Sequence, residues 1–152
     1  MKYLLDSNTL SELYDPEAVH NDCISAHVSG LDEDDYLCIS ILSLYELEYG
    51  WANASEKKKS DIRQVITDIQ TEFTVVALSA QGAMVFGNLK KRIKETRSSS
   101  KENMKKFNID VMLAATAITH QLVLVSADAV YAELQRYNSS LSIKNWTEEM
   151  ML

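Results

Sequence analysis

The sequence has little of the residues that interrupt or cross-link a fold: one proline, four glycines and two cysteines among 152 residues. This composition excludes a collagen-like chain and an architecture of proline-rich or glycine-rich linkers, so we expect mostly helix and strand. Cys23 and Cys38 form no Cys-x-x-Cys pair and have no cluster of histidines beside them. Neither a disulfide framework nor a structural zinc site is indicated, and we predict two buried, reduced thiols.

Long apolar runs are missing as well. The apolar start of the chain is short and is interrupted by Asp6, which does not suit a signal peptide, and no later stretch approaches the length of a membrane span. We therefore expect a cytoplasmic protein with no membrane partner. The chain length and the 46% of hydrophobic residues suit a single domain over residues 1–152.

Positive charge is scarce over the chain as a whole. There are 15 Lys and Arg residues against 22 Asp and Glu residues, which gives a formal net charge of −7. Such a balance argues against a protein that coats nucleic acid or binds an anionic membrane surface. Non-specific binding to polyanions is therefore not expected.

What the chain does contain is an alternation of short apolar segments with helical patterns. The apolar segments predict strands, and apolar residues at helical spacing predict helices between them. The predicted strands are residues 2–5, 36–40, 73–78 and 122–126, with an edge strand at 141–143. The predicted helices cover about 44–51, 57–69, 80–93, 109–119 and 129–134, and a further helix follows a loop after the first strand. This alternation favours an α/β fold with a mostly parallel sheet that is covered on both faces and binds its ligands at the carboxyl ends of the strands.

Two local features lie before the helix at 109–119. Residues 98–106 are rich in serine and lysine and predict a mobile loop. Asn108 is predicted to be the N-cap of the helix that follows, because asparagine is favoured at that position. That helix is apolar nearly all round, which predicts that it is buried against the sheet.

Four acidic residues fall where such a sheet would place a site. Asp6 and Asp128 close two apolar strands, Asp110 opens the buried helix, and Glu46 lies about one turn into the helix after the second strand. All four are therefore expected at one edge of the sheet. Clustered carboxylates repel one another unless a divalent cation or shared protons offset their charge. Oxygen ligands without histidine or thiolate suit Mg²⁺ or Mn²⁺ better than Zn²⁺.

Each acid also has a purely structural interpretation. Ser43-x-x-Glu46 is a capping-box pattern that would close a helix terminus. Asp110 in a first helical turn is favoured by the helix dipole without any catalytic role. Asp6 would serve equally as a cap for the next helix, and Asp128 as the start of a turn.

Four segments resemble, in order, the motifs of the PIN-domain nucleases and, within them, of the VapC toxins of bacterial and archaeal toxin–antitoxin pairs. Together they cover the chain from residue 1 to residue 128. The segments are DSN at 6–8 after the first strand, SILSLYELEYG at 40–50, DVMLAATA at 110–117 and LVLVSAD at 122–128.

The resemblance implies an α/β/α sandwich in three layers that binds one or two Mg²⁺ or Mn²⁺ ions and hydrolyses RNA phosphodiester bonds. It also implies a homodimer and a cognate antitoxin protein that silences the enzyme. An alternative is an inactive PIN-like module that binds RNA or protein. Matched position by position, the implied catalytic and metal-binding acids are Asp6, Glu46, Asp110 and Asp128, with Asn8 and Ser126 helping to orient them.

The charge is divided unevenly along the chain. Residues 90–106 have a net charge of +6, which leaves −13 for the rest. A solvated helix face is one explanation for this basic run. Because the run leads directly to Asp110, it is also a candidate for binding RNA phosphates beside the metal site. The candidate RNA contacts are Lys90, Lys91, Arg92, Lys94, Arg97, Lys105 and Lys106.

Three tyrosines flank the candidate acids in sequence: Tyr3, Tyr45 and Tyr49. Contact with a substrate and packing in the core are both compatible with their positions. Core packing is the preferred interpretation, since a large aromatic side chain buries much apolar surface.

Overall fold

The computed structural model describes residues 1–97 and 104–150 and contains one parallel sheet of five strands. The strands lie in the order β3-β2-β1-β4-β5, and every neighbouring pair is parallel. The predicted α/β class is confirmed, and every predicted strand is present, β1 and β2 with the predicted ends and β3, β4 and β5 with slightly different ones. The strands are β1 (Lys2–Leu5), β2 (Tyr36–Ser40), β3 (Thr74–Val76), β4 (Val123–Val125) and β5 (Ser142–Lys144).

The helices follow the predicted alternation, with two differences near the start of the chain. A helix begins directly after Asp6 where a loop was expected, and another lies within the acidic segment before β2, where none was predicted. The helices are α1 (Ser7–Leu13), α2 (Asn21–Ser29), α3 (Ile41–Asn53), α4 (Glu56–Glu72), α5 (Ala80–Arg97), α7 (Asn108–His120) and α8 (Ala129–Tyr137).

Two predictions around the start of α7 need correction. In the loop predicted over 98–106, residues 98–103 lie outside the described part, while Met104 and Lys105 are helical. Asn108 is not the N-cap of α7 but its first residue, because the preceding residue, Phe107, already has helical backbone angles. The side-chain oxygen of Asn108 is buried without a hydrogen-bond partner among the described residues.

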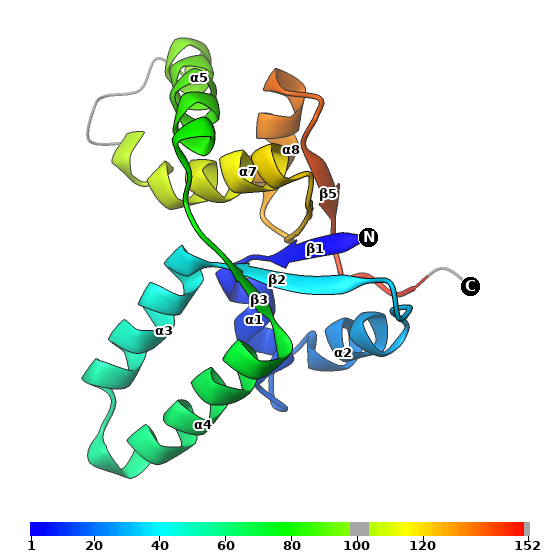
Figure 1. Ribbon diagram of the computed structural model, residues 1–152, viewed down its shortest axis with the longest axis vertical. Helices are drawn as coiled ribbons and strands as arrows, with labels where there is room; N and C mark the ends of the chain where they lie inside the picture. The colour runs from blue at the N-terminus through cyan, green and yellow to red at the C-terminus, as the bar shows by residue number, and fades with distance from the viewer. Residues whose placement is uncertain (98–103, 151–152) are drawn as a thin grey trace.

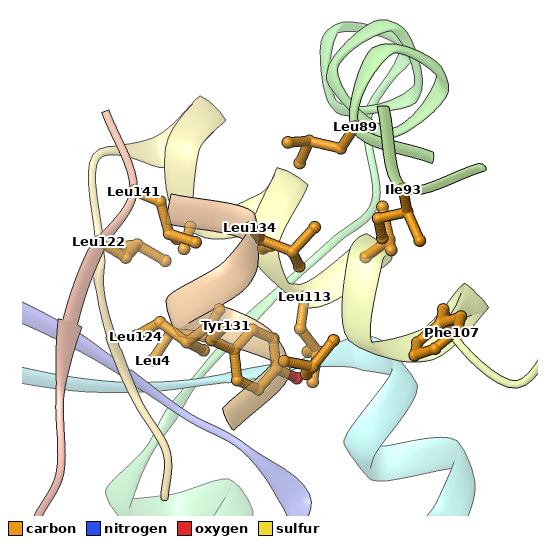
Figure 2. Close-up of a cluster of buried hydrophobic side chains, with 14 of the residues drawn as sticks. Leu4, Leu89, Ile93, Phe107, Leu113, Leu122, Leu124, Tyr131, Leu134 and Leu141 are labelled. Carbon is orange, nitrogen blue, oxygen red and sulfur yellow. The ribbon is translucent and has the colours of Figure 1, made fainter. Parts of the chain in front are cut away.

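Helices cover both faces of the sheet and give three layers, as Figure 1 shows. Because side chains alternate along a strand, Leu4 and Leu124 lie on one face and pack with α5, α7 and α8. Leu5 and Val125 lie on the opposite face and pack with α1, α2 and α4. In Figure 2, Leu113 of α7 belongs to the first of these two cores.

The order of the strands fixes where a ligand site can form. From β1 the chain proceeds to β2 and β3 on one side of the sheet, and β4 and β5 then extend the other side. The carboxyl ends of β1 and β4 therefore flank the point where the two halves diverge, and open α/β sheets bind ligands in the crevice at such a point. The backbone N–H of Asp6 donates to the carbonyl of Val125 at 3.1 Å, which holds the first residue after β1 against β4.

The described residues agree in part with the remaining expectations from composition. Cys38 is buried and Cys23 is half-buried, and both are free thiols. Within residues 1–97 and 104–150, no helix has the length and apolar character needed to cross a bilayer.

Candidate active site

The structure brings the four candidate acids together at the carboxyl edge of the sheet. They line one cavity of about 250 Å³, although they come from four different parts of the chain. Asp6 follows β1, Glu46 lies in α3, Asp110 lies in the first turn of α7, and Asp128 precedes α8. The other lining residues are Ser7, Asn8, Ile109, Leu113 and Tyr131.

Asp6 is the most firmly held of the four acids. Its side chain is buried, and both carboxylate oxygens accept hydrogen bonds. The backbone N–H of Thr9 donates to Oδ1 at 2.8 Å, so Asp6 is the N-cap of α1. The hydroxyl of Ser126 donates to Oδ2 at 2.5 Å. The suggested capping role of Asp6 is therefore confirmed, and it leaves the carboxylate at the edge of the cavity.

Ser126 connects Asp6 with Asp128. While its hydroxyl donates to Asp6, its oxygen accepts a hydrogen bond from the backbone N–H of Asp128 at 3.0 Å. Asp128 is itself the N-cap of α8, because its Oδ1 accepts from the backbone N–H of Val130 at 3.0 Å. One serine therefore fixes the spacing between the residues that follow β1 and β4.

Glu46 is held by a neighbouring hydroxyl and not by a helix terminus. The Ser7 hydroxyl donates to its Oε1 at 3.2 Å, and the oxygens of Ser7 and Ser43 are 3.1 Å apart. The capping-box interpretation of Ser43 and Glu46 is wrong, because the N-cap of α3 is Ser40, whose hydroxyl oxygen accepts from the backbone N–H of Leu42. Glu46 is instead an exposed acid in the second turn of α3.

The pKa of Asp110 is raised, and the other three acids contribute to this shift. Burial raises the pKa of its carboxyl, the negative charge of Asp128 raises it further, and Asp6 and Glu46 add smaller contributions in the same direction. The hydroxyl of Tyr131, which donates to Oδ1 at 3.3 Å, lowers the pKa of Asp110 and so acts against them. A partly buried carboxylate among three others is stabilised by a proton or by a cation.

The donor set of the cavity fits a hard divalent cation. Carboxylate oxygens converge without histidine or thiolate, which is the chemistry that Mg²⁺ and Mn²⁺ prefer. Within residues 1–97 and 104–150, no group of three or more His, Cys, Asp or Glu residues lies close enough together to hold a metal ion.

A comparison with known families decides what kind of domain carries this cavity. The family model described as the PIN domain matches residues 3–137, a segment that includes all four acids. The chain belongs to the PIN domain family.

Solved structures share the architecture of this PIN domain over almost its whole length. A chain in VapBC2 from Rickettsia felis, bound to a DNA fragment from its promoter, matches with a TM-score of 0.75 and 20% identity, covering 96% of this chain and 99% of that one. VapBC-1 from nontypeable Haemophilus influenzae matches with a TM-score of 0.73 and 20% identity, covering 97% of this chain and 100% of that one. FitAcB from Neisseria gonorrhoeae matches with a TM-score of 0.70 and 23% identity, covering 95% of this chain and 97% of that one. A search of curated proteins found no match.

The seven candidate RNA-binding side chains are not part of the lining of the acidic cavity. Lys90, Lys91 and Lys94 line a separate depression on α5 of about 360 Å³. Arg97 is engaged elsewhere, because its guanidinium forms a two-pronged ion pair with the buried Glu133 of α8. The expectation that the basic run stands directly beside Asp110 is therefore not reproduced for these lysines and for Arg97.

The remaining candidates also have definite positions. Asn8 lines the cavity and is exposed, whereas Tyr3 is buried and packs against Trp146 with ring centres 5.1 Å apart. Tyr45 and Tyr49 are 71% and 72% exposed on α3, so the prediction that they pack in the core is wrong.

Two contributors to the site were missed at the level of sequence. Ser7 and Tyr131 each donate a hydrogen bond to one of the four acids. Ser7 follows Asp6 directly and belongs to the DSN motif at residues 6–8, so its place in the sequence indicated that it lies near the site. Tyr131 lies three residues after Asp128, one helical turn further along α8, and this spacing was the only sign of its position.

Proposed function

We propose that this PIN domain is a metal-dependent endoribonuclease and that it is the toxin of a VapBC-like toxin–antitoxin pair. The observation that carries the proposal is the convergence of four carboxylates, from four elements of a PIN fold, on one cavity at the carboxyl edge of the sheet. The raised pKa of Asp110 is consistent with it, because burial raises this pKa most and the neighbouring carboxylates, Asp128 first, raise it further.

Each acid has a proposed share in the reaction. Asp6, Glu46 and Asp110 are the main ligands of Mg²⁺ or Mn²⁺, and Asp128 is the fourth. When bound, the ion supplies Lewis acidity and charge neutralisation for hydrolysis of an RNA phosphodiester. Asp6 offers a fixed carboxylate because Thr9 and Ser126 hold both of its oxygens. Asn8 and Ser126 support this arrangement, Ser126 through its contacts to Asp6 and Asp128.

The experiment is cleavage of single-stranded RNA with Mg²⁺ or Mn²⁺, comparing wild type with Asp6→Asn and Asp110→Asn. Asparagine keeps an oxygen that can cap α1 at position 6, so the fold is retained while a ligand charge is lost. We expect both variants to lose cleavage, and chelation of the metal to abolish it in wild type. Asp22→Asn is the matched control, because Asp22 is an exposed acid in the first turn of α2 and does not line the cavity. Unchanged cleavage in both site variants contradicts the proposal.

The alternative is an inactive PIN-like module that binds RNA or protein. Calorimetric titration with Mn²⁺ separates the two functions. A nuclease binds Mn²⁺ in a manner that depends on Asp110, whereas a module without a site shows no such binding.

The proposed protein partner is a cognate antitoxin, and the proposed assembly is a homodimer. The matched structures, which include VapBC proteins and a member of the VapBC family of toxin–antitoxin systems from Mycobacterium tuberculosis, support the antitoxin. The homodimer rests on the resemblance to VapC toxins alone. Size-exclusion chromatography of the chain alone, and together with the product of the neighbouring gene, tests both. Elution as a monomer contradicts the homodimer, and the absence of a joint complex contradicts the antitoxin.

A further inference from the structure

Tyr131 combines a buried ring with a hydroxyl group that reaches the acidic cavity. It is 1% exposed, and its ring lies among the apolar side chains that join α7, α8 and the sheet (Figure 2). Tyr131 also lines the cavity, and its hydroxyl donates to Oδ1 of Asp110 at 3.3 Å. A buried hydroxyl without a partner is costly, so this contact sets the direction in which the phenol points.

The four acids differ in how they are held. Asp6 has donors on both oxygens, and Asp128 is fixed by the N-terminus of its own helix. Glu46 and Asp110 each receive one side-chain hydrogen bond from the described residues, from Ser7 and Tyr131 respectively. The donor to Glu46 is the hydroxyl of Ser7 on α1. The donor to Asp110 is the hydroxyl of Tyr131, whose ring is buried in the apolar core.

We propose that Tyr131 is a positioning residue that holds Oδ1 of Asp110 and thereby presents Oδ2 of that carboxylate to the divalent cation. The proposal rests on the function proposed above. An aspartate side chain can rotate about two bonds, and a donor on one oxygen restricts that rotation before the ion arrives. The packing of α8 against α7 holds the ring of Tyr131 in place, and the ring in turn fixes the position of the hydroxyl that contacts the carboxylate of Asp110.

A purely structural role for the hydroxyl makes a different prediction. Side chains of both helices, among them Leu113, Val130 and Leu134, already belong to one buried apolar cluster. In that case removal of the hydroxyl changes only the stability of the fold. In the positioning role it changes the affinity for the cation.

The test is a calorimetric titration of the full chain with Mn²⁺, comparing wild type with Tyr131→Phe. Loss of a hydrogen bond to a metal ligand typically weakens metal binding by about 10–100-fold, and we expect a loss in this range. RNA cleavage by Tyr131→Phe should recover as the concentration of Mn²⁺ is raised. Circular dichroism and a melting curve without metal show whether the variant is folded.

Tyr137→Phe is the matched control. Tyr137 lies on the same helix, and its hydroxyl also donates to a carboxylate, Oε1 of Glu133 at 3.1 Å, but neither residue lines the cavity. We expect this variant to bind Mn²⁺ with wild-type affinity.

Parallel titration of Asp110→Asn distinguishes the two ways of failing. Binding of Mn²⁺ by wild type but not by Asp110→Asn supports the metal site. If Tyr131→Phe then binds Mn²⁺ with wild-type affinity, the positioning role is overturned and the metal site is not. If Tyr137→Phe weakens Mn²⁺ binding as much as Tyr131→Phe, the effect is general and the positioning role is also overturned. If wild type itself binds no Mn²⁺, the proposed function fails, and the role of Tyr131 fails with it.

Discussion

Replacing Asp128 by asparagine and by alanine separates its contact with α8 from its negative charge. The Oδ1 atom of Asp128 accepts the backbone N–H of Val130 at 3.0 Å, and asparagine provides an oxygen in the same place. Alanine removes that hydrogen bond, and loss of an N-cap costs about 1 kcal/mol. In a chain of 152 residues this corresponds to a decrease in melting temperature of about 2–4 °C.

The asparagine variant is expected to melt close to wild type. It loses the favourable interaction of a negative charge with the N-terminus of α8, but it also removes the repulsion that Asp128 exerts on Asp110. Both variants are expected to need more Mn²⁺ for RNA cleavage, since each lacks the fourth carboxylate.

Two measurements check this reasoning: thermal melting followed by circular dichroism without metal, and cleavage across a series of Mn²⁺ concentrations. Equal melting temperatures for Asp128→Asn and Asp128→Ala would refute the capping contribution. Wild-type dependence on Mn²⁺ in Asp128→Asn would refute its role as a ligand. The two roles are therefore tested independently at one position.

Two further predictions concern charge. Asp110→Asn should raise the melting temperature of the metal-free protein at neutral pH, because a raised pKa means that ionised Asp110 destabilises the fold. The gain should shrink as the pH falls and vanish well below the ordinary carboxyl pKa of about 3.9, where Asp110 is protonated in both the folded and the unfolded state, so a gain that is independent of pH contradicts it. Replacing Lys90, Lys91 and Lys94 by glutamine should weaken RNA binding and flatten its salt dependence, by about 0.7 in the logarithmic slope for each phosphate of a single strand that a lysine no longer neutralises. Fluorescence anisotropy over a salt series measures this, and an unchanged slope removes these lysines from the RNA interface.

The sheet, and the edge at which the four acids gather, could be predicted because both follow from short apolar segments and the parallel direction of the strands. Short apolar segments such as residues 122–126 stand between polar stretches, and parallel strands place their carboxyl ends at one edge. The proximity of Asp6 to Asp128 follows from that rule once β1 and β4 are neighbours, as they are. The rule uses the backbone direction alone, which is why it holds without knowledge of the side-chain packing.

The errors arose where the apolar pattern is weak or where packing decides. Helix α2 buries only Ile24 completely, so its sequence resembles a polar connection. Asn108 is a residue type that favours the cap position, but Phe107 takes that position and already has helical backbone angles, so α7 begins one residue earlier than propensity suggests.

Contacts between distant helices were beyond the reach of spacing arguments. The hydrogen bond from Tyr131 to Asp110 spans 21 residues and depends on how α8 lies against α7. The ion pair of Arg97 with Glu133 likewise depends on the packing of α5 beside α8, which spacing along the chain does not reveal.

The hydrogen bond from Ser126 to Asp6 joins residues 120 positions apart. During synthesis Asp6 is made long before its partners Ser126 and Asp128, which follow it by 120 and 122 residues. A nascent chain that ends before β4 lacks both the central strand pairing and one of the four carboxylates. The cavity therefore cannot be complete until β4 and the residues that follow it have been synthesised and have paired with β1.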